Sequence, residues 1–252
     1  AGRQDPGQVV ARGETASKVG AAVRTRPAQV SGEIDMTMTQ SRTIERLPVN
    51  EEFAGEADAA AFDRASEALG AHGFDVRIVD DAATARAIVL SLLPEGAEVG
   101  EGASRTLDEI GLTEAIEKSG RFDAIRPRTR SMDRATQMRE IRKLGAAPDV
   151  QVNSVQALTE DGHMVLASQT GSQLGPVAMG AGKVILIVGL QKIVPDLATA
   201  FRRVEEYCYP IVDAMAQEAY GRHSAVNKML VLSGEAIPGR TTVVMVRRPV
   251  GI

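Results

Sequence analysis

A run of apolar, mostly β-branched residues at 183–189 is a strong strand signal. The run reads Lys183-Val-Ile-Leu-Ile-Val-Gly189 and shows no alternation of apolar and polar positions. Such a run is typical of a strand buried on both faces of a parallel sheet. We therefore predict a central strand here. Gln191, Lys192 and Asp196 follow it, at the sheet edge where open α/β folds bind ligands.

Apolar spacings elsewhere predict alternating helices and strands. Apolar residues recur every three or four positions in the helical segments, and they alternate or run together in the strands. The patterns predict helices at 56–70, 82–93, 106–111, 113–120 and 132–144, and strands at 74–79, 97–100 and 122–126. A further helix follows Pro195, with one apolar stripe formed by Leu197, Ala200, Phe201, Val204, Tyr207 and Cys208.

Two antiparallel strand pairs are predicted in the second half of the chain. Strands at 149–154 and 163–168 flank a turn that ends in Gly162, where a glycine tolerates positive φ. Strands at 228–233 and 241–247 flank a second turn rich in glycine and proline. With the earlier elements, these pairs predict an α/β fold in which a mostly parallel mixed sheet lies between helical layers.

The chain divides into a tail at 1–46 and one domain at 47–252. The first 46 residues show no sustained apolar period and carry seven basic and five acidic residues, so we expect a flexible tail. Of the net charge of −4, the domain therefore carries −6. Met36 or Met38 would be a plausible native start. A basic tail that binds an acidic partner is the alternative interpretation.

Composition argues against several classes of function. A net charge of −4, 3% aromatic residues and no tryptophan count against nucleic-acid binding. The single cysteine, Cys208, cannot hold an iron–sulfur cluster alone, so we expect no cofactor on this chain and a reducing cytoplasm. His72, His163 and His223 lack metal-ligand spacing, so no metal site is assigned. No apolar stretch reaches the roughly 20 residues of a membrane span.

The segment Gly100-Glu-Gly-Ala-Ser-Arg-Thr106 joins a predicted strand to a predicted helix. Gly102 would let the backbone approach a ligand, while Ser104, Thr106 and free amides would hold a phosphate or carboxylate. Arg105 would neutralise its charge. The third glycine of a dinucleotide motif and the Walker lysine are both missing. The alternative is a tight turn in which Ser104 caps the helix.

Two later loops carry further candidates. After Asn153, Glu160 lies beside Asp161 and would act as a general base, because neighbouring carboxylates raise one pKa. The alternative is a solvated hairpin turn. In the second loop, hydroxyls, an amide and a glycine hinge would wrap a polar ligand, or form a flexible connector. Its candidate residues are Thr170, Gly171, Ser172 and Gln173.

Lys192 and Asp196 lie on either side of Pro195 at the start of a helix. Lys192 would bind an anion or, if removed from water, act as a nucleophile or proton donor. The alternative is that helix capping and surface charge explain both residues.

Three segments together resemble the LUD-domain family, the lactate-utilisation proteins. They are Val-Gly-Leu-Gln-Lys-Ile-Val-Pro-Asp-Leu at 188–197, Ser-Arg-Thr-Leu-Asp-Glu-Ile-Gly-Leu at 104–112 and Ala-Leu-Thr-Glu-Asp-Gly at 157–162. The resemblance covers most of residues 56–250. It implies a three-layer α/β/α sandwich similar to the sugar-phosphate isomerase and CoA-transferase superfamily. It also implies a part in oxidising L-lactate to pyruvate beside separate subunits that carry iron–sulfur clusters.

The chain departs from many members of that family at two places. Residues 227–242 lack a cysteine cluster, and Gly171-Ser-Gln173 stands where many relatives have Gly-Asn-Arg. These departures indicate a cysteine-free branch.

Three hypotheses follow. The first is an accessory or substrate-binding component of L-lactate or 2-hydroxy-acid oxidation, with Arg105, Thr170, Ser172 and Lys192 around a small carboxylate. The second is a stand-alone enzyme acting on a sugar phosphate or acyl thioester, with Glu160 as base and Lys192 holding the anion. The third is a structural, non-catalytic subunit. The first two require Ser104, Thr170 and Lys192 to meet at one pocket rim.

Overall fold

The computed structural model describes residues 46–252, which belong to one compact unit. The predicted flexible tail at 1–46 lies outside the described residues, apart from Arg46. Within the described part of the chain, no helix is both long and apolar enough to cross a membrane.

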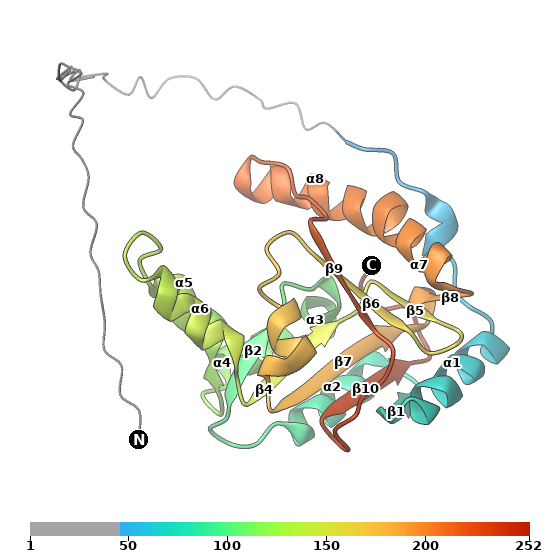
Figure 1. The fold of residues 1–252 in the computed structure, drawn as a ribbon, viewed down its shortest axis with the longest axis horizontal. Helices are drawn as coiled ribbons and strands as arrows, with labels where there is room; N and C mark the ends of the chain where they lie inside the picture. Colours follow the sequence, from blue (N-terminus) through green and yellow to red (C-terminus); the bar gives the residue numbers. More distant parts are fainter. Residues whose placement is uncertain (1–45) are drawn as a thin grey trace, which may run out of the picture. The chain divides into compact units, whose positions relative to one another are not determined.

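A six-stranded, fully parallel sheet forms the centre of this unit (Figure 1). The strand that the apolar run predicted, β7, pairs with β10 on one side and β4 on the other, so the prediction of a central strand is confirmed. The order across the sheet is β1 (Asp75–Val79), β10 (Thr241–Val246), β7 (Lys183–Gly189), β4 (Val150–Ser154), β2 (Glu98–Glu101) and β3 (Asp123–Ala124).

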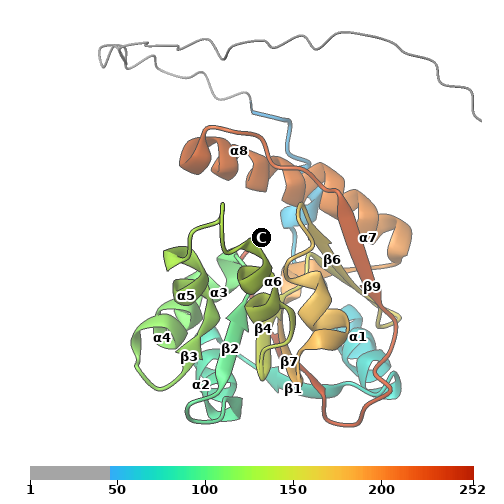
Figure 2. The same ribbon diagram turned by 60° about the vertical axis from the view of Figure 1, so that its left-hand side comes forward.

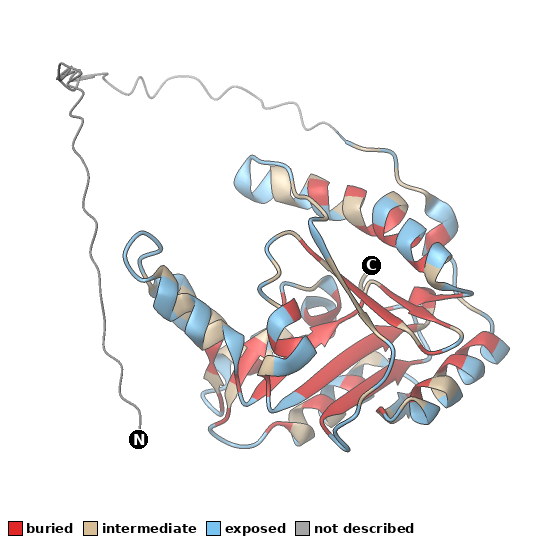
Figure 3. Cartoon of the chain, in the orientation of Figure 1, coloured by how far each residue is buried: buried red, intermediate tan, exposed pale blue. Residues whose placement is uncertain are grey.

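The side chains of β7 alternate between two apolar cores, which explains why its sequence lacks polar positions. Ile185 and Ile187 face a core formed with helices α2 to α4. Leu186 and Val188 face a core formed with α1 and a second sheet. Buried residues accordingly fill the central strands, while exposed ones line the outer faces of the helices (Figure 3).

The second sheet has four strands in the order β8 (Ile193–Val194), β5 (Ala157–Thr159), β6 (Met164–Ser168) and β9 (Lys228–Leu232). β6 runs antiparallel to both β5 and β9. Met164 and Leu166 face the main sheet, whereas Val165 faces α7 and the turn that follows it. The antiparallel strands therefore form a separate layer between the main sheet and helices α7 and α8 (Figure 2).

Helices cover the outer faces of both sheets, so the predicted α/β fold with a mostly parallel sheet flanked by helices is confirmed. The α-helices are α1 (Ala59–Ala71), α2 (Ala82–Leu92), α3 (Arg105–Glu109), α4 (Leu112–Lys118), α5 (Ile125–Ser131), α6 (Met138–Ala146), α7 (Leu197–Arg203) and α8 (Tyr209–Tyr220). Shorter turns are η1 (Glu51–Ala54) and η3 (Leu190–Lys192), which are 3₁₀-helical, and η2 (Pro176–Gly180) and η4 (Val204–Cys208), which are π-helical.

The two predicted antiparallel pairs are wrong, because in neither case do the two predicted strands pair with each other. β4 and β6 lie in different sheets, and the turn at Gly162 joins β6 to β5, a short strand that we had placed within the turn. β9 and β10 also lie in different sheets, and β10 instead pairs in parallel with β1 and β7. All residues of β4 and β10 are buried, which is the pattern of a parallel strand covered on both faces.

Two element boundaries also differ. The strand predicted at 122–126 ends at Ala124, because α5 begins at Ile125 with Pro127 in its first turn, where proline is tolerated. The helix predicted at 132–144 begins only at Met138.

Replacing Leu186 with alanine should lower the free energy of unfolding by about 2–5 kcal/mol, because it opens a cavity between the two sheets. Leu186 has no exposed surface, whereas Met179 is 75% exposed. Met179→Ala is therefore the control and should change stability by less than about 0.5 kcal/mol. Urea unfolding measures both, and equal losses in the two variants would contradict this account of the core.

Candidate functional site

The side chain of Lys192 is buried at the carboxyl edge of the main sheet, with 2% of the residue exposed. Its Nζ donates hydrogen bonds to Thr106 Oγ1 at 2.8 Å, Ser154 Oγ at 2.8 Å and the Val155 carbonyl at 3.2 Å. Thr106 belongs to α3, which follows β2, and Ser154 ends β4. One ammonium group therefore joins the segments that follow three strands of the sheet.

The two hydroxyls that accept from Lys192 pass hydrogen bonds onward. Ser154 Oγ donates to the Ile187 carbonyl at 2.7 Å, and Thr106 Oγ1 donates to the Val250 carbonyl at 3.4 Å. Each hydroxyl has one proton to donate and lone pairs to accept with, so both roles are satisfied at once.

Residues 250–252 pass over this cluster. The Gln191 side chain bonds the Val250 backbone in both directions, with Nε2 donating to the carbonyl at 2.9 Å and Oε1 accepting from the amide at 3.2 Å. The Gly251 amide donates to Glu109 at 2.9 Å. Gly251 has a φ of +75°, and a Cβ there would lie 2.1 Å from Thr106 Oγ1. Only glycine fits this close approach.

Burial is the main cause that lowers the pKa of Lys192 from 10.5 to about 7, and the positive charge of Arg203 lowers it further. Its three hydrogen-bond acceptors among the described residues are two hydroxyls and a carbonyl, none of them charged. A buried cation bonded only to neutral groups is costly, and a bound anion would offset that cost.

Glu101, which the sequence interpretation passed over, ends β2 next to Gly102. Burial raises its pKa to about 7, against the opposing charge of Arg126. Both carboxyl oxygens, and Nη1 of Arg126, are buried without a hydrogen-bond partner among the described residues. This group is a second ionisable side chain shifted toward neutrality, on the side of β2 that faces α5.

Four candidate residues lie in the turn after β2 and the start of α3, and they differ in burial and in contacts. Thr106 is buried against Lys192. At Gly102 an added Cβ would lie 1.7 Å from Asn153 Oδ1, so a side chain there would require the Asn153 side chain to move. Ser104 occupies the position before α3 but makes no capping hydrogen bond, and Arg105 is exposed.

Glu160 and the loop at 168–175 make contacts of their own. Glu160 forms an ion pair with Arg64 of α1 at 2.7 Å. Thr170 and Ser172 share a hydrogen bond at 3.1 Å, and Gln173 donates to the Ala167 carbonyl. No hydrogen bond links these residues, or Gly171, to Lys192 within residues 46–252.

Asp196 caps α7 by accepting a hydrogen bond from the Thr199 amide at 2.7 Å, as its alternative interpretation predicted. Lys192 does not follow that interpretation, because it is buried rather than a surface charge. Cys208 lies in the core as predicted, with 3% exposed. One buried thiol does not suit an iron–sulfur cluster, which takes about four cysteine ligands. No cluster of three potential metal ligands occurs between Arg46 and Ile252.

Sequence reasoning missed Arg203, which has no exposed surface. It follows Ala200 by three residues and precedes Tyr207 by four, so it lies on the inward stripe of the helix. Phe201, which we had assigned to that stripe, is 37% exposed, so that assignment is wrong. The helical spacing was the signal that could have located Arg203, but an arginine on an apolar stripe is normally read as exposed.

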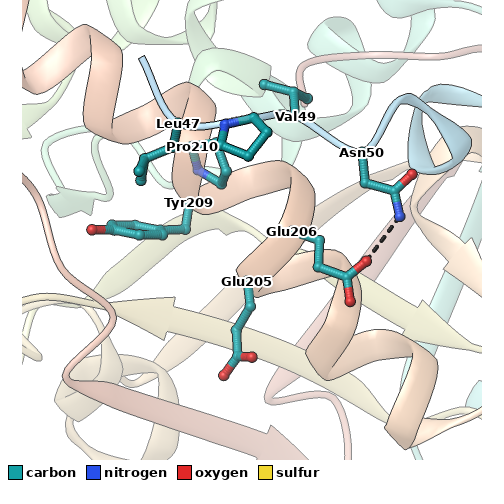
Figure 4. Close-up of a pocket in the computed structure, with 8 residues that line it drawn as sticks. Leu47, Val49, Asn50, Glu205, Glu206, Tyr209 and Pro210 are labelled. Carbon is teal, nitrogen blue, oxygen red and sulfur yellow. Dashed lines mark hydrogen bonds between the residues drawn. The ribbon is translucent and has the colours of Figure 1, made fainter. Parts of the chain in front are cut away.

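A groove of about 400 Å³ lies apart from Lys192, between the segment at 47–50 and the start of α8 (Figure 4). Leu47, Tyr209 and Pro210 give it apolar walls, while Glu205 and Glu206 add carboxylates. Glu206 is paired with Arg202 at 2.9 Å, so it is the charge of Glu205 that makes the groove a poor site for a small carboxylate.

Comparison with known proteins found similarity to one family. A family model described as the LUD domain matches residues 62–246. The crystal structure of a DUF162 family protein from Deinococcus radiodurans is similar, with 13% sequence identity and a TM-score of 0.48. The similarity covers 76% of this chain and 99% of that one. A search of curated proteins gave no match.

Replacing Gly251 with alanine should destabilise the fold more than the same change at Gly239. Both glycines have positive φ, +75° and +74°, so both variants lose about 1–2 kcal/mol to backbone strain. Only at Gly251 does the new Cβ collide with Thr106, which adds about 1–3 kcal/mol. Chemical unfolding measures the difference, and equal losses would show that residues 250–252 do not press on the site.

The low pKa of Lys192 predicts a pH-dependent stability. The unfolded state, with a pKa of 10.5, keeps the proton that the folded state releases above about pH 7. The free energy of unfolding therefore rises with pH between those values. Lys192→Met removes the group and should abolish that contribution. Urea unfolding from pH 6 to pH 9 tests this, and a constant difference between wild type and variant would rule out the desolvated amine.

Proposed function

Since the chain belongs to the LUD-domain family, we propose that it binds L-lactate, or a related 2-hydroxy acid, beside Lys192 during oxidation to pyruvate. The family is associated with lactate utilisation in general. The observation that carries the proposal is the amino group of Lys192, buried at the carboxyl edge of the main sheet and bonded to neutral groups alone.

Electrostatic attraction favours an anionic ligand at Lys192. A ligand oxygen that takes the place of the Val155 carbonyl, the longest of the three contacts at 3.2 Å, gains a charge-assisted hydrogen bond from Lys192 in a low-dielectric site, where such bonds are strong. It also removes the penalty of the isolated cation. Thr106 and Ser154 then hold the ammonium in place, so that little side-chain entropy is lost on binding.

The role that fits this chain is a substrate-binding or accessory component. Oxidation of a 2-hydroxy acid to a 2-keto acid releases two electrons and two protons, and an electron acceptor must take them. Iron–sulfur clusters on partner subunits are the acceptor in this proposal, because the lone buried Cys208 does not suit a cluster. We place the process in the cytoplasm, where a single free cysteine stays reduced.

A thermal-shift experiment tests the binding step. L-lactate, pyruvate or glycolate should raise the melting temperature of the wild type, since a ligand at 100 times its Kd adds about 2.7 kcal/mol to stability. Lys192→Met should lose that shift. Lys183→Met, at the exposed start of β7, is the matched control and should keep it. Equal shifts in both variants would refute a role for Lys192.

An activity assay separates the remaining functions. Pyruvate formation from L-lactate that requires added iron–sulfur subunits supports the proposal. Turnover of a sugar phosphate or acyl thioester by the isolated chain supports the enzyme alternative instead. A Lys192→Met protein that binds and supports turnover like the wild type leaves only a structural subunit.

A further inference from the structure

Arg203 is a second buried cation next to the Lys192 cluster, and half of its guanidinium is unused. Nη1 donates to the Gln156 carbonyl and lies 3.1 Å from Cys208 Sγ. Nε and Nη2 are buried and have no hydrogen-bond partner among residues 46–252. The Tyr207 ring packs on the guanidinium face, with 5.0 Å from Cζ to the ring centroid. One face and one edge are thus occupied, and the Nε–Nη2 edge is free.

This arrangement is energetically unfavourable for a purely structural arginine. Buried arginines are normally paired with carboxylates, because an unpaired guanidinium in a low-dielectric interior loses its hydration without compensation. No salt bridge to Arg203 forms in the described part of the chain. The energetic cost points to a use outside the fold itself.

The two cations are anchored on one short link. Lys192 bonds the carbonyl of Val155 and Arg203 bonds the carbonyl of the next residue, Gln156, in the connection from β4 to β5. The charge of Arg203 is also felt at Lys192, since it contributes to lowering the pKa of the amine. The two positive groups therefore lie near each other, on the connection from β4 to β5.

The donors on the Nε–Nη2 edge of Arg203 determine which chemical group can bind there. The Nε–Nη2 edge of a guanidinium presents two parallel N–H donors whose spacing matches the two oxygens of a carboxylate. Lysine is a point charge with rotatable donors and suits a single oxygen.

We propose that the Nε–Nη2 edge of Arg203 binds the ligand's carboxylate with two hydrogen bonds, while Lys192 exchanges its contact with the Val155 carbonyl for one with the oxygen on the adjacent carbon. The site is thereby assigned to 2-hydroxy and 2-keto acids. The choice of these acids rests on the proposed function, but the assignment of Arg203 as the carboxylate-binding group does not.

The experiment compares Arg203→Lys with Arg202→Lys by isothermal titration of L-lactate, pyruvate, acetate and lactamide. Arg202 is the matched control, because it is exposed and paired with Glu206 at 2.9 Å. Arg203→Lys keeps the charge but loses the two-donor edge. We expect L-lactate and pyruvate to bind it at least tenfold more weakly than the wild type, and to bind Arg202→Lys unchanged. Lactamide, which lacks the carboxylate, should bind none of them.

The other possible results of the titration distinguish the assignment of Arg203 from the proposed function. If L-lactate binds Arg203→Lys as tightly as the wild type, the assignment of Arg203 is overturned and the proposed function stands. If acetate binds the wild type but L-lactate and pyruvate do not, and Arg203→Lys loses acetate, the proposed function fails and the carboxylate site stands. If none of the three carboxylates binds the wild type, both are overturned.

Arg203→Met distinguishes a ligand-binding arginine from a structural one without relying on ligand. Replacing an unpaired buried charge by an apolar side chain of similar length is often neutral or stabilising. We expect the ligand-free variant to melt at or above the wild-type temperature and to lose binding of L-lactate. A variant that is folded at low temperature but melts far below the wild type would show that Arg203 serves the fold, and would overturn the assignment.

Discussion

The removal of one ammonium group from water determines how the carboxyl edge of the main sheet is built. Lys192 must find partners for its three N–H groups inside the protein, and it finds them on Thr106, Ser154 and the carbonyl of Val155. Those groups follow β2 and β4, while Lys192 follows β7. The three hydrogen bonds of one side chain therefore hold three chain segments in fixed relative positions. The segment at 250–252 then covers the cluster.

The local causes of this arrangement are steric as well as electrostatic. The 3₁₀ turn at Leu190–Lys192 follows Gly189 directly, and a side chain at Gly189 would collide with Gln191 Oε1 and the Val250 amide. The glycine therefore lets the turn and residue 250 pack closely. Gly251 plays the same part against Thr106. Close backbone packing excludes water, which in turn keeps the ammonium desolvated.

The positions of helices and strands could be predicted from the sequence more accurately than the pairing of the strands. The apolar run of β7 and the spacings of α1 and α2 mark buried faces directly, so these elements are where they were expected. The pairing of β9 with β10 was inferred from closeness in sequence, although the unbroken apolar run of β10 already indicated a strand covered on both faces. For the site, the sequence placed Lys192 beside a buried strand, but burial of its side chain depends on Thr106 and Ser154, which are distant in sequence. We did not predict burial of Arg203, because an arginine is normally exposed. Its position on the apolar stripe of the helix indicated burial.

The place of β10 in the sheet has a consequence for how the protein is made. β10 is the last strand in chain order within the described residues, yet it lies between β1 and β7. Until residues 241–246 leave the ribosome, β1 has no neighbour in the main sheet and β7 has one open edge. Such open edges recruit other chains. The core is therefore completed late and at long sequence separation, which favours slow folding.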